Sequence, residues 1–396
     1  MAQDNGKLIK CTIEKTVFGG DGLARVDGQA VFIPYALPGE KIIARVKKSK
    51  NDFLVAEIEK IVEPSPHRIQ PLCKYYTRCP GCNYGHMGFE LENQLKMEQL
   101  QEFFKDFDCE FSAYAPGSPY YYRNKVVFHT NKAGRETFFG YVGDDNQTVF
   151  DVESCPLARP EINEKIAELR HTNGFFHSIH HGMSVTFRYT SENGALFWRN
   201  NPAKNMSWLK EKISSGNFAI PPESFFQVNF ECGMELLRLV GEAIKELRVK
   251  SFIDLYCGCG FFSTAAAQLR VPQIIGIESD AEAINAARYN MKQFNHPDAA
   301  FIAGDAAREL PKISEQISQD SLLVVDPPRQ GLSAQAAAAI VKSRVRHLIY
   351  ISCKPSTLRR DANNLKRSGF KLKSARMVNM FPRTGHFEVF TIFERL

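Results

Sequence analysis

Apolar and polar positions in the second half of the chain alternate between two patterns. Short apolar runs are separated by longer stretches with helical periodicity, which is typical of repeated strand–helix units. The runs lie at residues 251–256, 273–278, 300–305, 321–326 and 347–352. Such spacing predicts a parallel sheet with helices on both faces, so we assign residues 223–396 to the α/β class. An amphipathic helix precedes the first run, with Asn229 as its N-cap.

The first 62 residues follow a different pattern, in which strand-like runs recur between Gly and Asp turns. These runs, at residues 10–18, 23–34, 39–48 and 52–62, predict a small five-stranded β-barrel with one internal turn. Three prolines in "EPSPHRIQP" then break the pattern and mark a linker.

The middle of the chain, residues 72–222, mixes both periodicities. It contains a helix candidate at residues 88–104 and aromatic-rich strands at residues 120–130 and 184–190. This mixture predicts a central α+β domain.

Composition indicates the number of domains and the cellular compartment. The chain has 396 residues, of which 44% are hydrophobic and 24% charged, enough for roughly two or three domains with cores. No run of eighteen apolar residues occurs, and "MAQDNGKLIK" lacks the order of a signal peptide. We therefore expect a cytoplasmic monomer without a membrane segment. In a reducing compartment, its ten cysteines favour metal binding or catalysis over disulfides.

Charge is unevenly distributed along the chain. The net charge is only +6, but residues 341–383 contain twelve Lys or Arg and a single acid, Asp361. A positive field of this kind suits a polyanion such as RNA. The alternative is a solvated helix face that serves solubility.

Polar residues gather where the predicted strands end. Gly258 and Gly260 follow the first run and Glu278 ends the second, while Asp305 and Asp326 end later runs. In an open α/β sheet, ligands bind beyond the carboxyl ends of the strands, so this edge suits a ribose-bearing cofactor. The alternative for the glycines is a tight turn between strand and helix.

The loop after the first run distinguishes two cofactors. A dinucleotide fingerprint needs three glycines, but Tyr256 stands in place of the first and Ser263 in place of the third. The acid-rich loop favours the sulfonium of S-adenosylmethionine over a pyrophosphate. "VVDPPRQGL" then fixes Asp326 beside this edge through two prolines. It resembles the Asp-Pro-Pro-aromatic motif of amino-group methyltransferases, with Arg329 replacing the aromatic residue, so amino-group methylation is an alternative chemistry.

Cys353 is the candidate nucleophile. C5 of uracil accepts a methyl group only after a thiolate adds to C6, and a base must then remove the C5 proton. Cys353 ends the last apolar run, Pro355 suits the first turn of a helix behind it, and Lys354 favours the thiolate. The alternative is a small core cysteine.

The candidate base lies in "TGHFEVFTIF". Strand alternation puts His386, Glu388 and Phe390 on one face, so Glu388 or His386 is placed to accept the proton. The alternative for Glu388 is an exposed strand carboxylate.

Five segments together resemble a known family. "SFFQVN", "DLYCGCGFFS", "VVDPPRQGL", "YISCKPSTLRRD" and "GHFEVF" are similar in order and approximate spacing to the RNA uridine C5-methyltransferases. Members that methylate 23S ribosomal RNA carry an N-terminal TRAM domain, an OB-like RNA-binding barrel. The resemblance implies a TRAM barrel at residues 1–62, a central domain at 72–222 and a Rossmann-like class I methyltransferase domain at 223–396.

The resemblance also implies roles for individual residues. Cys353 is then the nucleophile and Glu388 the base. The expected S-adenosylmethionine site comprises Gln227, Tyr256, Gly258, Glu278, Asp305 and Asp326. Some relatives have an asparagine where this chain has Phe261, so that contact is not carried over. "YRNKVVFH" resembles the family's basic strand, which makes Arg123 and Lys125 candidates for RNA contacts; the alternative is ordinary surface charge.

Three cysteines within ten residues suggest a metal site. Cys73, Cys79 and Cys82, with Cys155 as a fourth thiolate, suit either structural zinc or an iron–sulfur cluster. The spacing alone does not choose between them, and the resemblance favours a [4Fe-4S] cluster.

The predicted function is transfer of a methyl group from S-adenosylmethionine to C5 of a uridine in structured RNA. The resemblance favours 23S ribosomal RNA as the substrate. Three alternatives remain: a transfer RNA uridine C5-methyltransferase, an amino-group methyltransferase and a non-catalytic RNA-binding protein.

Overall fold

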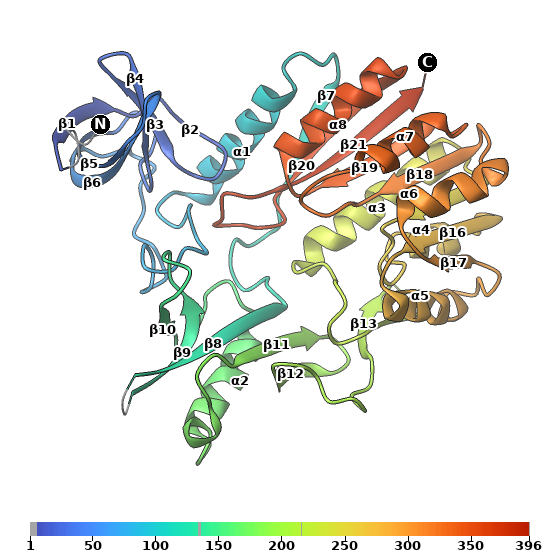
Figure 1. Ribbon diagram of the computed structural model, residues 1–396, viewed down its shortest axis with the longest axis horizontal. Helices are drawn as coiled ribbons and strands as arrows, with labels where there is room; N and C mark the ends of the chain where they lie inside the picture. The colour runs from blue at the N-terminus through green and yellow to red at the C-terminus, as the bar shows by residue number, and fades with distance from the viewer. Residues whose placement is uncertain (1–5, 134–135, 215, 396) are drawn as a thin grey trace. The chain divides into compact units, whose positions relative to one another are not determined.

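The structure is a computed structural model that describes residues 6–133, 136–214 and 216–395 (Figure 1). Contacts along the chain divide it into two compact units. Unit 1 comprises Met1–Glu102, Val142–Thr148 and Phe381–Phe387, and unit 2 comprises Phe103–Tyr141, Val149–Met380 and Glu388–Leu396.

Unit 1 begins with a mostly antiparallel six-stranded sheet in the order β1-β5-β6-β4-β3-β2. Its strands are β1 (Leu8–Thr12), β2 (Lys15–Thr16), β3 (Gly22–Val26), β4 (Gln29–Ile33), β5 (Lys41–Ser49) and β6 (Phe53–Glu63). β1 also packs against β3, and a buried apolar cluster that includes Val31, Ala44 and Val46 fills the interior. The predicted number of five strands is wrong, because the first run divides. Its backbone changes partners there, from Glu40 O for the Ile13 N–H to Leu23 O for the Glu14 N–H.

Helix α1 (Phe89–Phe104) also belongs to unit 1 and falls within the predicted helix at residues 88–104. Lys96 Nζ donates to Glu92 Oε1 at 2.9 Å, and both side chains are fully buried. The same carboxylate oxygen accepts the Arg383 N–H at 2.9 Å. This bond fastens segment 381–387 to the helix.

The largest sheet of unit 2 has eight strands in the order β17-β16-β15-β18-β19-β21-β20-β7. They are β7 (Glu110–Tyr114), β15 (Ser251–Leu255), β16 (Gln273–Glu278), β17 (Ala300–Ala303), β18 (Ser321–Val325), β19 (His347–Ser352), β20 (Phe370–Val378) and β21 (Glu388–Arg395). The five predicted apolar runs become β15 to β19, which are mutually parallel. The prediction of a purely parallel sheet is wrong at β21, which runs antiparallel to both neighbours.

Helices cover this sheet in two packed groups, α3–α4–α5 and α6–α7–α8 (Figure 1). Their bounds are α3 (Phe230–Glu246), α4 (Ser263–Gln268), α5 (Ala281–Gln293), α6 (Ala306–Glu309), η2 (Leu310–Gln316), α7 (Ala334–Lys342) and α8 (Pro355–Arg367). Asn229 caps α3 by accepting from the Cys232 N–H, as predicted, and Pro355 opens α8. Among the described residues, no helix combines the length and apolar character needed to span a bilayer.

Unit 2 also contains most of the predicted central α+β domain, whereas residues 72–102 and 142–148 of that domain belong to unit 1. Its five-stranded sheet has the order β10-β9-β8-β11-β12, and a separate hairpin joins β13 to β14. The elements are β8 (Lys125–Ala133), β9 (Glu136–Val142), β10 (Val149–Asp151), α2 (Pro160–His171), η1 (Phe176–Ser178), β11 (Ser184–Thr190), β12 (Gly194–Arg199), β13 (Leu209–Ile213) and β14 (Gly216–Ile220). The predicted strand at 184–190 matches β11, whereas the one predicted at 120–130 begins only at Lys125. Tyr121, with a φ of +58°, interrupts the extended chain before it.

Candidate active site

Cys353 and Glu388 lie at the junction of two adjacent strands. β19 pairs with β21 in antiparallel register, with Ser352 opposite Val389. The same register carried one residue further sets Cys353 opposite Glu388. Opposed residues of an antiparallel pair point to the same face, so a thiol and a carboxyl group meet where β19 ends.

The environment of Cys353 keeps its thiol protonated in the resting protein. The pKa of Cys353 is raised to about 11, chiefly by burial and then by the charges of Glu388 and Asp326. Arg329 opposes these effects through its charge and a hydrogen bond to the thiol, both of which lower the pKa. Arg329 is therefore the described cation that favours thiolate formation.

Glu388 is the more deeply buried member of the pair, with only 7% of its surface exposed. Burial raises its pKa well above the usual range, the charge of Asp326 raises it further, and Arg329 lowers it. Its Oε2 atom is buried and has no hydrogen-bond partner among the described residues. A carboxylate in such surroundings is a strong proton acceptor once ionised, and the free Oε2 lone pairs are available for that proton.

Two further carboxyl groups extend inward from this pair. Burial raises the pKa of Asp326 to about 7, and the nearby Asp254 raises it as well. Burial likewise raises the pKa of Asp254 to about 7, although its Oδ2 accepts from Ser263 Oγ at 2.7 Å. Sheet edge and interior thus hold several carboxyl groups whose charge a bound cation would stabilise.

The loop between β15 and α4 is shaped for close approach to a ligand. Tyr256, Gly258 and Gly260 all have positive φ values, of +62°, +51° and +80°. A Cβ atom added at Gly258 would meet no atom within 4 Å, so open space lies above this residue. The Gly258 N–H donates to Glu278 Oε2 at 3.2 Å, which joins the loop to the end of β16.

Glu278 and Asp305 present carboxylates at two neighbouring strand ends. Glu278 Oε1 accepts from the Ser279 N–H, Ser279 Oγ and the Asp280 N–H, which fixes the side chain. Asp305 caps α6 through the Ala307 and Arg308 N–H groups, and its side chain is exposed. Fixed carboxylates beside a glycine loop fit the ribose hydroxyls and the positive charge of S-adenosylmethionine.

Gln227 and Phe261 lie near each other on the α3 side of this loop. Gln227 is buried, its backbone oxygen accepts from Asn124 Nδ2 at 2.9 Å, and its side chain packs close to Gly233. Phe261, the departure from the family pattern, packs edge-on against the rings of Phe218 and Phe226. Phe261 therefore packs in an apolar cluster, in agreement with the expectation that this position makes no polar contact with the cofactor.

Comparison with known proteins identifies the family. The family model for tRNA (uracil-5-)-methyltransferases matches residues 212–396, and the TRAM domain model matches residues 3–58. An uncharacterized RNA methyltransferase of Aquifex aeolicus is 30% identical over 98% of this chain and 99% of its own. The chain belongs to the RNA (uracil-5-)-methyltransferase family. The amino-group and non-catalytic alternatives do not agree with this membership.

Further matches support the same fold for this RNA methyltransferase. An uncharacterized RNA methyltransferase of Caldanaerobacter subterraneus is 29% identical, with 99% of both chains covered. The crystal structure of the Pyrococcus abyssi tRNA (uracil-54, C5)-methyltransferase with S-adenosyl-L-homocysteine superposes with a TM-score of 0.75. It is 21% identical and covers 97% of this chain and 100% of its own. The class I S-adenosylmethionine-dependent methyltransferase fold with an N-terminal TRAM domain is thereby confirmed.

The two predicted RNA contacts of the methyltransferase are only partly accessible. Arg123 and Lys125 are both half-buried, and the Arg123 N–H donates to Leu157 O at 2.8 Å. Burial and the neighbouring Arg188 lower the pKa of Lys125. Their contact with RNA remains a prediction.

The predicted metal ligands are divided between the units. Cys73, Cys79 and Cys82 belong to unit 1 and Cys155 to unit 2. No group of three or more His, Cys, Asp or Glu side chains within the described ranges is placed to hold a metal ion. The side-chain arrangement therefore does not support the predicted [4Fe-4S] or zinc site. Cysteine thiolates repel one another without a cation between them, and a preformed metal site rarely exists without its ion.

Acids distant in the sequence neutralise much of the basic segment. Among the described residues, the ion pairs with distant acids are Arg346–Glu394, Arg359–Asp106, Lys371–Asp108, Lys373–Glu394, Arg376–Glu235 and Arg383–Glu92. The positive field predicted for residues 341–383 is accordingly weaker than the sequence count suggests. His386, the other candidate base, precedes β21 and belongs to unit 1, where its ring packs against Phe18.

One exposed aromatic residue near the site escaped the sequence reasoning. Phe225, two residues before Gln227, has 68% of its surface exposed. The buried Arg188 side chain holds the preceding turn by donating to Pro222 O at 2.9 Å and Ser224 O at 3.0 Å. The two adjacent phenylalanines in "SFFQ" could have indicated an exposed ring, but the sequence does not show which of the two is exposed.

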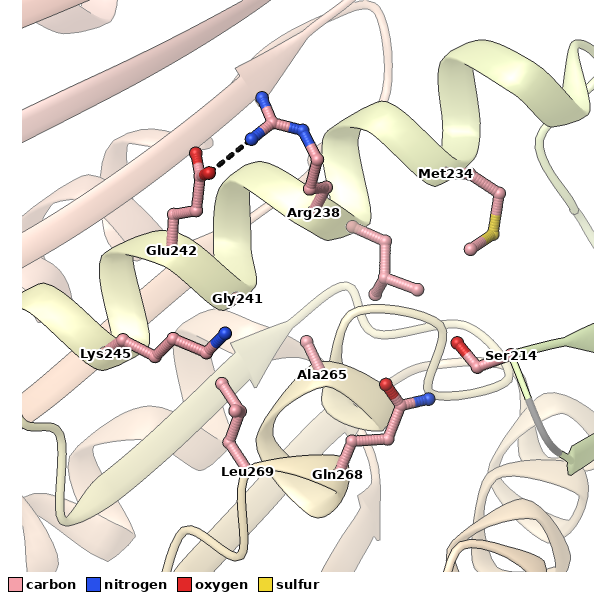
Figure 2. A pocket seen from close by; sticks show the side chains of 10 residues that line it. Ser214, Met234, Arg238, Gly241, Glu242, Lys245, Ala265, Gln268 and Leu269 are labelled. Carbon is pink, nitrogen blue, oxygen red and sulfur yellow. Dashed lines mark hydrogen bonds and ion pairs between the residues drawn. The ribbon is translucent and has the colours of Figure 1, made fainter.

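A cavity elsewhere in unit 2 is distinct from the site. It has a volume of about 330 Å³ and lies between α3 and α4 (Figure 2). Met234, Ala265 and Leu269 line it, and Arg238 pairs with Glu242 at its side. None of its lining residues is a predicted site residue, so we assign it no part in methyl transfer.

Replacing Glu278 by alanine is expected to weaken cofactor binding. The change removes the carboxylate that would accept from ribose hydroxyls and the acceptor of the Gly258 N–H. Loss of charge-assisted hydrogen bonds should raise the Kd for S-adenosylhomocysteine by roughly 10- to 100-fold. Calorimetric titration checks this, with the exposed Glu315→Ala as the matched control. An unchanged Kd in folded Glu278→Ala protein would contradict the assignment.

Proposed function

We propose that this RNA methyltransferase methylates C5 of a uridine through a transient bond between Cys353 and C6 of the base. The observation that supports the proposal is the pairing of Ser352 with Val389, which brings the adjacent Cys353 and Glu388 together at the sheet edge that also carries the glycine loop and Glu278. Nucleophile, base and cofactor site are thereby brought to one edge of one sheet.

Each residue has a defined task in this mechanism. Arg329 favours loss of the thiol proton, and the Cys353 thiolate bonds to C6, which moves electron density to C5. S-adenosylmethionine supplies a methyl group that C5 takes up. Glu388 then accepts the C5 proton, the C5–C6 double bond re-forms and the thiolate leaves. Oxygen Oε2 of Glu388, which has no described hydrogen-bond partner, suits this proton transfer.

The cofactor residues divide into two groups in the proposal. Glu278 and Asp305 bind the ribose and nucleoside end, with Tyr256 and Gly258 forming the loop beneath it. Gln227 and Asp326 border the methyl group and the target base. Their fixed backbone and side-chain hydrogen bonds support this division.

The target base has to leave its stack to reach Cys353. Phe225, the exposed ring beside Gln227, provides a stacking surface for it. The half-buried Arg123 and Lys125 contact phosphates near the site, and the TRAM domain binds RNA outside it. We further propose a cytoplasmic monomer with three domains at residues 1–62, 72–222 and 223–396.

For the RNA substrate we propose 23S ribosomal RNA, on the resemblance of the five sequence motifs. Transfer RNA is a second candidate, because a transfer RNA enzyme matches almost the whole chain in fold. Mass-spectrometric mapping of 5-methyluridine in a deletion strain distinguishes them. Loss from 23S ribosomal RNA supports the first proposal, and loss from transfer RNA alone overturns it.

Metal binding by Cys73, Cys79, Cys82 and Cys155 is a separate proposal that rests on the resemblance. Iron and acid-labile sulfide in anaerobically purified protein, lost together in Cys79→Ser, would support a [4Fe-4S] cluster. Zinc without sulfide would support a structural zinc site. Protein with neither would overturn both.

Capture of a fluorinated RNA tests the proposed chemistry directly. Fluorine at C5 cannot leave as a proton, so methylation should stop at the stage of the covalent adduct. Wild-type protein incubated with 5-fluorouridine RNA and S-adenosylmethionine should therefore form a complex that survives denaturing electrophoresis. Peptide mass spectrometry should place the bond at Cys353. Turnover of normal RNA without any capture of the fluorinated RNA would overturn the mechanism.

A further inference from the structure

Hydrogen bonds join the loop that carries Arg329 to helix α8, which begins two residues after Cys353. Four hydrogen bonds join them: Thr357 Oγ1 to Arg329 O (3.3 Å), Arg360 Nη2 to Gln330 O (3.0 Å) and to Leu332 O (3.2 Å), and the Leu332 N–H to Asp361 Oδ2 (2.9 Å). One helix thus holds the loop backbone at three positions, Arg329, Gln330 and Leu332.

Asp361 is the centre of this attachment. Only 2% of its surface is exposed, and Oδ2 also accepts from Tyr350 OH at 2.7 Å. Its Oδ1 accepts from Arg360 Nε at 2.9 Å. Tyr350 lies on β19 three residues before Cys353, so one buried carboxylate joins the strand, the helix and the loop. Bonds of this charge-assisted kind are short and directional.

Gly331 shows how closely the loop approaches this carboxylate. It has a φ of +76°, and a Cβ atom at this position would lie 2.5 Å from Asp361 Oδ2. The same atom would lie 2.7 Å from Arg360 Nη2. Only glycine fits here, because a side chain would push the loop away from α8.

The attachment has a consequence for the thiol. The Arg329 guanidinium lowers the pKa of Cys353 by its charge and a hydrogen bond, and both effects depend on distance. Side chains of α8 donate to the backbone oxygens of Arg329 and Gln330, and the Gly331 N–H closes a turn within the loop by donating to Pro328 O. A loop released from Asp361 would carry the guanidinium away from the sulfur.

We propose that Asp361 is a positioning residue, which holds loop 326–332 so that Arg329 stays beside the Cys353 sulfur and speeds formation of the nucleophile. The inference rests on the proposed function for its role in methyl transfer. The effect on thiol reactivity itself is independent of RNA. Asp361 does not contact the reacting atoms, and its influence is exerted through Arg329.

Alkylation of Cys353 tests the proposal without RNA. In Asp361→Asn, the rate of carbamidomethylation by iodoacetamide at pH 8, followed for the Cys353 peptide by mass spectrometry, should fall by about 3- to 10-fold. The midpoint of its pH profile should move upward, because Arg329 no longer favours the thiolate. The Kd for S-adenosylhomocysteine should stay within about twofold of the wild type, since Glu278 and the glycine loop are untouched.

Two comparisons separate positioning from simple loss of stability. Asp320→Asn is the first comparison. Asp320 precedes β18, whereas the loop with Arg329 follows it, and Asp320 pairs with Lys250. This variant should leave the pH profile of Cys353 alkylation unchanged. In an Arg329→Gln background, Asp361→Asn should slow alkylation no further. An equal slowing in both backgrounds, or a smaller reactive fraction with an unmoved midpoint, would overturn the proposal.

A second variant, with fewer lost hydrogen bonds, tests the proposal if Asp361→Asn does not fold. Thr357→Val removes only the bonds from Thr357 Oγ1 to Arg329 O and Lys354 O, and should shift the midpoint in the same direction by less. An unshifted midpoint in this variant would also count against positioning. If the midpoints shift as expected but 5-fluorouridine RNA is never captured, the proposed function fails while the positioning role stands.

Discussion

Replacing Cys353 by alanine should abolish methyl transfer while leaving the protein folded and able to bind both substrates. Without the thiolate, C5 of uracil is too weak a nucleophile to take the methyl group, so we expect a loss of roughly 10³-fold or more. Transfer of labelled methyl groups to RNA measures the loss. The fluorinated RNA should no longer be captured, and the Kd for S-adenosylhomocysteine should not change.

Cys109→Ala is the matched control for this variant. Burial raises the pKa of Cys109 to about 11, as it does for Cys353, but Cys109 immediately precedes β7 and no cation lowers its pKa. Methyl transfer by this variant should remain within about twofold of the wild type. Undiminished transfer by Cys353→Ala would mean that the RNA accepts the methyl group without a covalent bond to this sulfur.

The site combines acids with the guanidinium of Arg329, and this sets its pH dependence. A thiol with a pKa near 11 is protonated at neutral pH, so the thiolate fraction should rise about tenfold per pH unit below that value. Glu388 also has a raised pKa and is inactive as a base while it carries its proton. Both groups therefore predict that activity rises with pH. The positive charge of the bound methyl donor favours ionisation of the neighbouring carboxyl groups and acts in the same direction.

Much of the α/β fold was predictable, because strands buried on both faces appear as unbroken apolar runs. Residues 322–325 are all apolar and are followed directly by the acid Asp326, and this pattern predicted both the strand and the edge at which it ends. Strand direction is not encoded in such runs, so the strand predicted around Glu388 was confirmed as β21 but its antiparallel direction was not predicted. β7 was missed because its residues are half-exposed and find their partner, β20, more than 200 positions later in the chain.

The residues of the candidate site were likewise only partly predictable from the sequence. Cys353 and Glu388 were predicted as site residues because each stands at a strand end within a recognisable motif. Asp361 appeared in the sequence only as the single acid of a basic segment, and nothing local indicated that it is buried against a loop from residues 329–332. The positive field expected from residues 341–383 was overestimated for a related reason. Its neutralising acids come from distant positions such as Asp106 and Glu394.

Glu388→Gln should separate methyl transfer from product release. Glutamine keeps the shape of the side chain but cannot accept the C5 proton, so the first methyl transfer proceeds and the thiolate cannot leave. Ordinary RNA should then form a covalent, methylated complex with the protein, up to about one methyl group per enzyme. Multiple turnover should fall by roughly 10²- to 10⁴-fold, the range expected for loss of a general base. Labelled methyl groups that migrate with the protein in denaturing electrophoresis measure the trapped complex.

The pH profile of this variant provides the decisive comparison. In the wild type, a carboxyl group with a raised pKa limits turnover at low pH and becomes effective as pH rises through that value. The rate of adduct formation by Glu388→Gln should lose this contribution and retain only the dependence set by Cys353. Glu394→Gln, at the far end of the same strand, should behave like the wild type. Normal turnover by Glu388→Gln, or covalent complexes that contain no methyl group, would assign proton removal to another residue. The structure places His386 before β21 and in unit 1, so the next residue to replace would be Asp326, a buried carboxyl group whose charge raises the pKa of Glu388.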